Sequence, residues 1–307
     1  MMNSKENQNK QNGIIVKLTG GFYYVEIAET VYECKARGRF RHKENSPCVG
    51  DKVVIELQKE GYTLIDKVVD RKNRLVRPAV ANIDKLFIIV SVTDPLPNTL
   101  IIDKIIASAV NKDIEPIVII SKTDIADCSQ IKKIYENSGI KTIAYNMEES
   151  SNLEEIKSML KDGISVFTGN SGVGKSTLLN KLFPKLELET SHTSKKLGRG
   201  RHTTRTVELF KTDGGGYVAD TPGFSNMELE RYEIINKEEI QYCFPEFEKY
   251  LGQCKFNSCA HIKEKGCKVI EALENGEIEQ SRFNSYVAMY NEVKDIKEWQ
   301  LKWKTDV

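Results

Sequence analysis

The N-terminal part of the chain alternates short runs of β-branched and aromatic residues with turns that contain glycine or aspartate. Runs of this kind are typical of β-strands. They predict five strands, at residues 14–18, 22–27, 31–36, 53–57 and 62–68. Five short strands indicate a small closed β-barrel, and an OB-fold is the leading candidate because it has five strands and often binds oligonucleotides. Many functions share this barrel, so the fold alone does not select one.

From about residue 79 to residue 228 the pattern changes to continuous apolar runs that alternate with helical segments. Buried parallel strands require such runs, and the alternation indicates an α/β domain. The predicted strands are residues 86–92, 116–120, 142–145, 164–168, 207–210 and 217–219. The predicted helices are residues 100–110, a segment from about 130, a short helix from a capping box at Ser151 and Glu154, and residues 176–183. Ligands of such sheets bind at the C-terminal ends of the strands.

Three motifs typical of GTP-binding proteins follow one another in rotated order. Ser121-Lys122-Thr123-Asp124 comes first, the segment from Gly169 to Ser176 second, and Asp220-Thr-Pro-Gly223 last. The middle motif fits G-x-x-x-x-G-K-[ST], whose backbone N–H groups cradle phosphates while its lysine reaches the β- and γ-phosphates. It follows a predicted strand and opens a predicted helix, as the motif requires. The predicted phosphate-binding residues are Gly169, Asn170, Ser171, Gly172, Val173, Gly174, Lys175, Ser176 and Thr177.

The first motif resembles the Asn-Lys-x-Asp signature that recognises guanine. The Asp124 carboxylate can accept two hydrogen bonds from guanine N1–H and N2–H, a donor pair that adenine lacks. Lys122 would lay its stem against the base, and Ser121 replaces the usual asparagine, whose amide braces the loop. Taken alone, Lys-x-Asp is also compatible with an ordinary surface turn. Its position after a buried strand favours guanine recognition.

The last motif supplies groups for Mg²⁺ and the γ-phosphate. Asp220 can hold Mg²⁺ directly or through water, and the Gly223 N–H can meet the γ-phosphate. Ser176, at the end of the phosphate motif, is a second predicted magnesium-binding residue, and a threonine of the loop before Asp220 is the third. Phe224 stands where Ras-like enzymes carry a glutamine that orients the attacking water. Water must therefore be positioned from elsewhere in the chain.

The loop 197–205 is the predicted source, because it lies between the phosphate loop and Asp220, where a first switch belongs. Thr204, or alternatively Thr203, would complete the Mg²⁺ shell. His202 would orient or polarise water, so His202, Lys175 and Thr204 are the predicted catalytic residues; an exposed loop histidine is the alternative. The loop arginines could contact RNA or stabilise charge, and the sequence does not separate these roles: Arg199, Arg201 and Arg205.

A cluster of metal-ligand residues lies near the C-terminus. Cys254, Cys259, His261 and Cys267 fall within 14 residues. Three thiolates and one imidazole can complete a closed tetrahedral Cys₃His zinc site, and reduced thiols are typical of an intracellular chain. We predict one structural Zn²⁺, with buried free thiols as the alternative. The remaining cysteines stand apart and are expected to be ordinary core or surface residues: Cys34, Cys48, Cys128 and Cys243.

A basic segment in the predicted barrel is the candidate RNA-binding site. Residues 1–78 contain 15 Lys and Arg against 10 Asp and Glu, whereas the whole chain carries 45 against 44. Residues 35–43 form a predicted loop in which basic and other residues alternate, so that Phe40 and His42 lie among five cations. Such a loop suits phosphate contacts and base stacking, although a solvated charged loop has the same composition. The predicted RNA-binding residues are Lys35, Arg37, Arg39, Phe40, Arg41 and Lys43.

The length of 307 residues suits two or three domains. Residues 1–12 are expected to form a disordered tail, 13–75 the OB-fold RNA-binding domain, 76–230 the nucleotide-binding domain and 231–307 a zinc-binding and helical domain. Aromatic and aliphatic residues recur at helical spacing from Phe283 to Trp299, which predicts a final helix. No signal peptide or long apolar run occurs, so we expect a monomeric cytoplasmic protein without a membrane partner.

The barrel, the rotated motifs and the Cys-x₄-Cys-x-His-x₅-Cys spacing together resemble the bacterial ribosome small-subunit-dependent GTPase A family. The resemblance covers nearly the whole chain. It implies a multidomain protein with an OB-fold, a central circularly permuted P-loop GTPase domain and a C-terminal zinc module with helices. It further implies GTP hydrolysis to GDP, with Mg²⁺, stimulated by the 30S subunit and its 16S rRNA during late maturation. His202 matches the family residue implicated in hydrolysis.

Two other function classes fit parts of the sequence. The chain could be an ATP-using P-loop enzyme, in which case Asp124 would not confer a preference for guanine. It could instead be an RNA-binding assembly factor that holds its nucleotide structurally, with negligible turnover. Measurements of hydrolysis with GTP and ATP distinguish both classes from a GTPase.

Overall fold

A computed structural model describes residues 9–41, 46–58, 62–76, 79–146, 151–184, 207–220 and 234–296. The chain divides into two compact units, each assembled from separate stretches of sequence. The first unit contains residues 1–85, 157–167 and 198–224, and the second contains residues 86–156, 168–197 and 225–307. This division crosses the predicted domain borders, because strands that follow the phosphate loop group with the N-terminal barrel.

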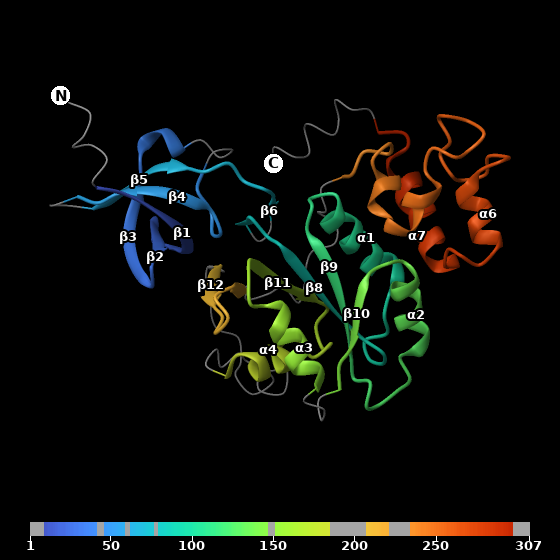
Figure 1. The fold of residues 1–307 in the computed structure, drawn as a ribbon, viewed down its shortest axis with the longest axis horizontal. Helices are drawn as coiled ribbons and strands as arrows, with labels where there is room; N and C mark the ends of the chain where they lie inside the picture. The colour runs from blue at the N-terminus through green and yellow to red at the C-terminus, as the bar shows by residue number, and fades with distance from the viewer. Residues whose placement is uncertain are drawn as a thin grey trace, which may run out of the picture. The chain divides into compact units, whose positions relative to one another are not determined.

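Five strands of the first unit close a barrel, drawn in blue in Figure 1. They are β1 (Lys10–Thr19), β2 (Phe22–Ile27), β3 (Thr30–Ala36), β4 (Lys52–Glu56) and β5 (Thr63–Val68). The order is β1-β2-β3-β5-β4, and β4 pairs back onto β1, which confirms the predicted closed five-stranded barrel. Alternate side chains face inward because successive residues of a strand point to opposite faces. The buried core consists of Ile15, Val25, Cys34, Val53, Ile55 and Ile65.

Two local predictions for the barrel need correction. β1 begins at Lys10 rather than at Gly13, because Lys10, Gln11 and Asn12 pair with residues of β4. These polar residues are ordered by pairing with β4, which their composition alone does not predict. The segment predicted as a loop over 35–43 is also more ordered: Lys35 lies in β3, as the predicted strand 31–36 requires, and Gly38–Arg41 form a 3-10 helix, η1.

A short hairpin, which the sequence analysis missed, follows the barrel. It consists of β6 (Arg74–Val76) and β7 (Ala79–Ala81). Gly50 of the barrel has a φ of +88°, and a Cβ there would lie 2.2 Å from the Ala81 carbonyl oxygen. Glycine is therefore required for this close approach. The Asn82 amide donates to the Gly50 carbonyl at 2.9 Å and secures the hairpin.

Three further strands belong partly or wholly to the first unit: β11 (Ile164–Gly169), β12 (Glu208–Lys211) and β13 (Tyr217–Asp220). β13 pairs in parallel with β11 and antiparallel with β12. β12 also pairs antiparallel with β1 of the barrel, where Lys17 lies opposite Glu208 and their charged groups are 2.7 Å apart. The barrel is therefore joined by backbone pairing to β12, and through β12 to β13, the strand that ends in Asp220.

The second unit contains β8 (Lys85–Ser91), β9 (Glu115–Ser121) and β10 (Lys141–Ala144) in the order β10-β9-β8. β9 and β10 are parallel, as the buried apolar runs predict. The helices α1 (Thr99–Val110), α2 (Ser129–Asn137), α3 (Ser151–Met159) and α4 (Lys175–Leu182) alternate with the strands. α3 begins at Ser151, whose side chain lies outside the described residues, so the expected capping box of Ser151 and Glu154 stays a prediction.

The C-terminal part of the second unit is helical. It consists of η6 (Ile240–Cys243), η7 (Pro245–Tyr250), α6 (Lys268–Glu274) and α7 (Gln280–Val293), drawn in orange to red in Figure 1. The Tyr286 ring packs against Phe247 and Phe244, with centroids 4.9 and 5.4 Å apart. α7 ends at Val293, so Ile296, which the predicted helix includes, lies beyond it, and Trp299 lies outside the described residues.

A buried ionic triad fixes this helical part to α1. Arg282 of α7 is fully buried and donates to the Asp103 carboxylate of α1 at 2.7 Å. It also donates to both carboxylate oxygens of Glu246 in η7, at 2.7 and 3.1 Å. Burial opposes the charge, but the two carboxylates raise the pKa of Arg282 above its usual value. Helices α1 and α7 lie side by side in Figure 1. Among the described helices, none is long and apolar enough to cross a membrane.

Candidate functional site

The predicted phosphate loop lies between β11 and α4, as the strand–loop–helix prediction requires. β11 ends at Gly169, and α4 begins at Lys175. Gly172 and Gly174 have φ angles of +84° and +91°, a left-handed backbone that favours glycine. A Cβ on Gly169 would lie 2.5 Å from the Ile89 carbonyl oxygen. The glycines thus permit a tight loop that turns backbone N–H groups toward a bound anion at the start of the helix.

The predicted guanine loop begins at the end of β9, and Ser121 ties it to the phosphate loop. The Ser121 hydroxyl lies 2.6 Å from the Val173 carbonyl oxygen and 3.0 Å from the Val90 carbonyl oxygen. It is almost fully buried, so the hydroxyl proton is shared between protein acceptors. Serine therefore supplies a brace of its own in place of the asparagine amide, which the sequence analysis did not anticipate.

The remaining residues of this motif form an exposed turn. The Ile125 N–H donates to the Lys122 carbonyl at 3.0 Å, and Lys122 has a φ of +60°. The Lys122 ammonium donates to the Asp94 carbonyl. Asp124 is exposed, while Thr123 is half-buried. The turn thus presents the Asp124 carboxylate to solvent beside the loop that Ser121 braces, which is the arrangement needed to accept hydrogen bonds from a base.

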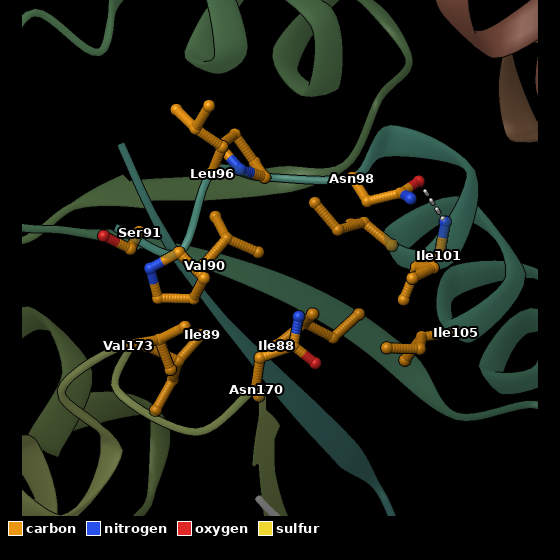
Figure 2. Close-up of a pocket in the computed structure, with 14 residues that line it drawn as sticks. Ile88, Ile89, Val90, Ser91, Leu96, Asn98, Ile101, Ile105, Asn170 and Val173 are labelled. Carbon is orange, nitrogen blue, oxygen red and sulfur yellow. Dashed lines mark hydrogen bonds between the residues drawn. The ribbon is translucent and has the colours of Figure 1, made fainter. Parts of the chain in front are cut away.

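A small pocket opens beside the phosphate loop (Figure 2). Its walls come from β8, the Pro95–Asn98 segment, α1 and the loop residues Gly169, Asn170 and Val173. The Asn98 side chain accepts the Ile101 N–H at 3.3 Å and caps α1 at this wall. The space of about 20 Å³ suits a water molecule but is far smaller than a nucleotide site. Its lining is mostly apolar and includes residues of the phosphate loop and of α1.

Several predicted catalytic and magnesium-binding positions lie outside the described residues. These are His202, Thr204, its alternative Thr203, and Gly223, as well as the side chain of Asp220. The backbone of Asp220 ends β13, as predicted. β13 belongs to the first unit, whereas the phosphate and guanine loops belong to the second. Convergence of Asp220 with those loops therefore stays a prediction.

The four predicted metal ligands come together. All four ligand atoms of Cys254, Cys259, His261 and Cys267 lie within 4.8 Å of one another, so the cluster could hold a metal ion. The Cys254 Sγ lies 3.8 Å from the Cys267 Sγ and 3.5 Å from the His261 Nδ1. Burial raises the pKa of the Cys259 thiol to about 12 and lowers the pKa of His261. A cation in the cluster would stabilise the thiolates against this burial.

Two residues that the sequence analysis missed support the cluster. The His261 Nε2 lies 3.0 Å from the Gln241 Oε1, so an Nε2–H that donates to Gln241 leaves the Nδ1 lone pair among the thiols. The Glu264 carboxylate accepts backbone N–H groups of Ala260, Ile262 and Lys263 at 2.9–3.1 Å. Burial opposes its charge, but these N–H groups hold the pKa of Glu264 below its usual value. Glu264 thereby fixes the loop that carries His261.

The remaining cysteines stand apart from the cluster, as predicted. Cys34, Cys48 and Cys243 are buried, and burial raises the pKa of each thiol to about 12. Cys128 is half-buried near the start of α2. Their positions support the view that only the C-terminal cysteines form a ligand set among the described residues.

The predicted RNA-binding residues are divided between two environments. Arg37 and Arg39 both contact the Asp66 carboxylate, at 3.3 and 3.5 Å, and Arg37 also pairs with Glu56. The Arg39 guanidinium lies 5.1 Å from the Phe40 ring centroid. Lys35 instead lies over aromatic rings elsewhere on the barrel. The side chain of Arg41 and the whole of Lys43 lie outside the described residues.

Comparison with known proteins places the whole chain in one family. A family model described as RsgA GTPase matches residues 68–230, and a second, described as RsgA N-terminal domain, matches residues 12–65. A protein named small ribosomal subunit biogenesis GTPase RsgA from Caldanaerobacter subterraneus subsp. tengcongensis is 43% identical over 288 residues, which cover 92% of this chain and 96% of the relative. Its namesake from Clostridium novyi is 43% identical over 294 residues, covering 95% and 99%.

Solved structures agree with this assignment. YjeQ from Thermotoga maritima matches with a TM-score of 0.78 and 37% identity, covering 94% of this chain and all of that chain (100%). YloQ, described as a circularly permuted GTPase, matches with a TM-score of 0.76 and 34% identity, covering 94% and 97%. These matches explain the rotated motif order and show a GTP-hydrolysing enzyme. The chain contains the barrel and the linked phosphate and guanine loops, and it matches relatives over nearly its full length. It therefore belongs to the RsgA GTPase family.

Proposed function

We propose that this protein binds the small (30S) ribosomal subunit and hydrolyses GTP to GDP and phosphate during late maturation of that subunit. The named relatives support the ribosomal part, because they are described as small ribosomal subunit biogenesis GTPases. The observation that carries the nucleotide part is the Ser121–Val173 hydrogen bond of 2.6 Å. It holds the predicted guanine loop to the predicted phosphate loop, so one nucleotide can contact both.

The nucleotide-binding roles follow from the chemistry of each group. Backbone N–H groups of the phosphate loop would hold the phosphates, Lys175 would neutralise their charge, and Asp124 would select guanine. Mg²⁺ would be held by Ser176 and Asp220 together with Thr204, and it would neutralise charge on the phosphates. His202 would position the attacking water, and Gly223 would meet the γ-phosphate. We expect slow intrinsic turnover that rises when ribosomal RNA contacts residues 190–205.

We also propose that the Cys₃His cluster holds one structural zinc ion. A tetrahedral zinc with ordinary bond lengths separates two sulfur ligands by about 3.8 Å, and a sulfur from a nitrogen by about 3.5 Å. The corresponding distances here are 3.8 Å for the Cys254 and Cys267 sulfurs, and 3.5 and 3.3 Å from the His261 Nδ1 to those sulfurs. The spacing and the soft ligand set fit zinc, whose role would be to hold the module together.

The barrel is the proposed contact with 16S rRNA. Lys35, Arg37, Arg39 and Phe40 lie on or beside it, and Arg41 and Lys43 follow in the sequence. Arginine and lysine contacts to phosphates give salt-dependent affinity without base selectivity. We expect the protein to act as a monomer in the cytoplasm, which size-exclusion chromatography and cell fractionation can test.

The test is hydrolysis of GTP and of ATP by the purified protein, alone and with 30S or 50S subunits. We expect hydrolysis of GTP but not ATP, with stimulation by 30S subunits only. A Lys175→Ala variant provides the matched control, because it retains the barrel and the metal cluster but loses the charge that faces the phosphates. Tight GTP binding without stimulation would contradict the proposal and favour an assembly factor with a structural nucleotide. Equal use of ATP would favour a different P-loop enzyme.

A further inference from the structure

An aromatic pair, exposed Tyr62 and half-buried Phe22, lies on the outer surface of the barrel with a lysine across it. Phe22, at the start of β2, and Tyr62, just before β5, have ring centroids 5.4 Å apart. The Lys35 ammonium lies 3.6 Å from the Tyr62 centroid and 5.0 Å from the Phe22 centroid. Tyr62 remains 49% exposed despite these contacts. We call Phe22, Tyr62 and Lys35 the aromatic platform.

The platform is not part of the barrel core. Tyr23 and Ile27 of β2 pack on the core with Val25, so the alternation of a strand turns Phe22 outward. In β3, Cys34 is buried and Val31 is 52% exposed, which places Lys35 on the outer face by the same alternation. Exposed aromatic rings gain little by facing water. The pairing of exposed Tyr62 with half-buried Phe22 on the outer face therefore indicates a surface that a ligand covers.

The charge around the platform favours an anionic ligand. Within the described part of the chain, Arg37 and Arg39 are ion-paired with Asp66, whereas Lys35 forms no ion pair. Its ammonium lies across two rings, a cation–π arrangement that leaves donor hydrogens for a further partner. An aromatic face next to a cation that has no ion pair among the described residues is the combination that binds nucleic acid strands, with bases on the ring and phosphate on the cation.

The form of the nucleic acid follows from the exposed ring face. A duplex hides the faces of its bases in the stack, whereas an unpaired nucleotide can turn its base onto an aromatic side chain. The face formed by strands 2 and 3 is also the one with which OB-folds bind oligonucleotides. We propose that the aromatic platform stacks an unpaired RNA base on Tyr62 while Lys35 contacts the adjacent phosphate. This inference rests on the proposed RNA-binding function of the barrel.

The test measures binding of the full-length protein to a short single-stranded RNA that contains one 2-aminopurine, and to the same sequence as a duplex. Stacking on an aromatic ring quenches 2-aminopurine fluorescence. We expect Tyr62→Leu to weaken single-strand binding about tenfold, to abolish the quenching and to leave duplex binding unchanged. Tyr62→Phe keeps the ring and should behave as the wild type. Lys35→Gln should lower the salt slope of single-strand binding by about 0.7.

Tyr242→Leu is the matched control, because Tyr242 is a comparably exposed tyrosine in η6 of the second unit. Unchanged melting temperatures establish that each variant is folded. Single-strand binding by Tyr62→Leu with wild-type affinity and quenching would overturn the platform alone. The same conclusion follows if the wild type binds 30S subunits but no single-stranded RNA. A wild type that binds neither would overturn the proposed function together with the platform.

Discussion

Replacement of Arg282 by methionine tests whether the buried triad holds the C-terminal helices on α1. The substitution removes three charge-assisted hydrogen bonds of 2.7, 2.7 and 3.1 Å and leaves the carboxylates of Asp103 and Glu246 buried without their cation. Breaking a buried ion pair by removing one partner costs about 3–5 kcal/mol. In a unit of this size each kcal/mol lowers the melting temperature by about 2–4 °C. We therefore expect a decrease of about 6–20 °C.

The assay is thermal unfolding followed by circular dichroism, at fixed nucleotide and metal concentrations because bound ligands stabilise the folded state. Lys104→Met is the matched control, because Lys104 pairs with Glu292 across the same two helices at 2.7 Å but at the surface. A surface pair contributes about 0–1 kcal/mol. A triple variant with apolar residues in place of Arg282, Asp103 and Glu246 should regain most of the lost stability, because no buried charge then remains.

The pH dependence identifies the cause of the loss. Burial already raises the pKa of Asp103 above its ordinary value of about 4. Without Arg282 the charge that lowers this pKa is lost, so the folded-state pKa of Asp103 rises further. A raised carboxyl pKa means that the folded variant binds more protons than the unfolded chain, so its stability falls as the pH rises above about 4. The difference from the wild type should therefore shrink on acidification. A loss below about 1 kcal/mol at neutral pH, or one independent of pH, would refute the reasoning.

Three further predictions concern the loops, the barrel and the metal. Ser121→Ala should weaken GDP binding about tenfold, because the buried Val173 carbonyl loses its donor at a cost of about 1–3 kcal/mol. Calorimetry with GDP measures this affinity, and an unchanged value would contradict the role of Ser121 in holding the two loops together. The Lys10 ammonium and nearby arginines hold the pKa of Asp66 below its usual value. The ionised Asp66 carboxylate therefore stabilises the folded protein fully above about pH 4. This contribution is lost as the pH falls through the lower folded-state pKa. Asp66→Asn should flatten this acid-side slope in urea unfolding and should tighten RNA binding with a steeper salt dependence; a weaker binder would argue against the freed cations. Cys267→Ser should reduce the bound zinc from one ion per chain to a small fraction, as measured by plasma mass spectrometry. It should also lower the melting temperature, as a chelator should do for the wild type. Full zinc occupancy in the variant would exclude Cys267 as a zinc ligand.

Much of the fold could be predicted because its signals are local. The apolar runs that became β8 and β9 are continuous and bounded by polar residues, so periodicity suffices to locate them. The hairpin β6–β7 was missed because each strand has three residues and depends on partners such as Gly50. β1 was predicted too short for the same reason, since the polar residues from Lys10 onward are ordered by pairing with β4.

The candidate functional site was likewise predictable only where its signals are local in the sequence. Motif spacing located the phosphate loop and the metal ligands because the chemistry demands particular residues at fixed intervals. Gln241 and Glu264 could not be found in this way, because a residue that orients a ligand needs only to be near it in space. Arg37 and Arg39 were expected to offer free charge. Both arginines instead form ion pairs with Asp66. Asp66 is distant from them in the sequence, so these pairs could not be predicted without the folded barrel.

The sequence by itself determined the barrel, the rotated nucleotide motifs and the metal-ligand set, because each depends on residue types at short range. Only the tertiary structure decided which side chains support these parts: the Ser121 brace, the Arg282 triad and the platform of Phe22, Tyr62 and Lys35. The physical reason is that burial and pairing energies act between atoms close in space. Residues far apart in the sequence meet only after the strands and helices have packed.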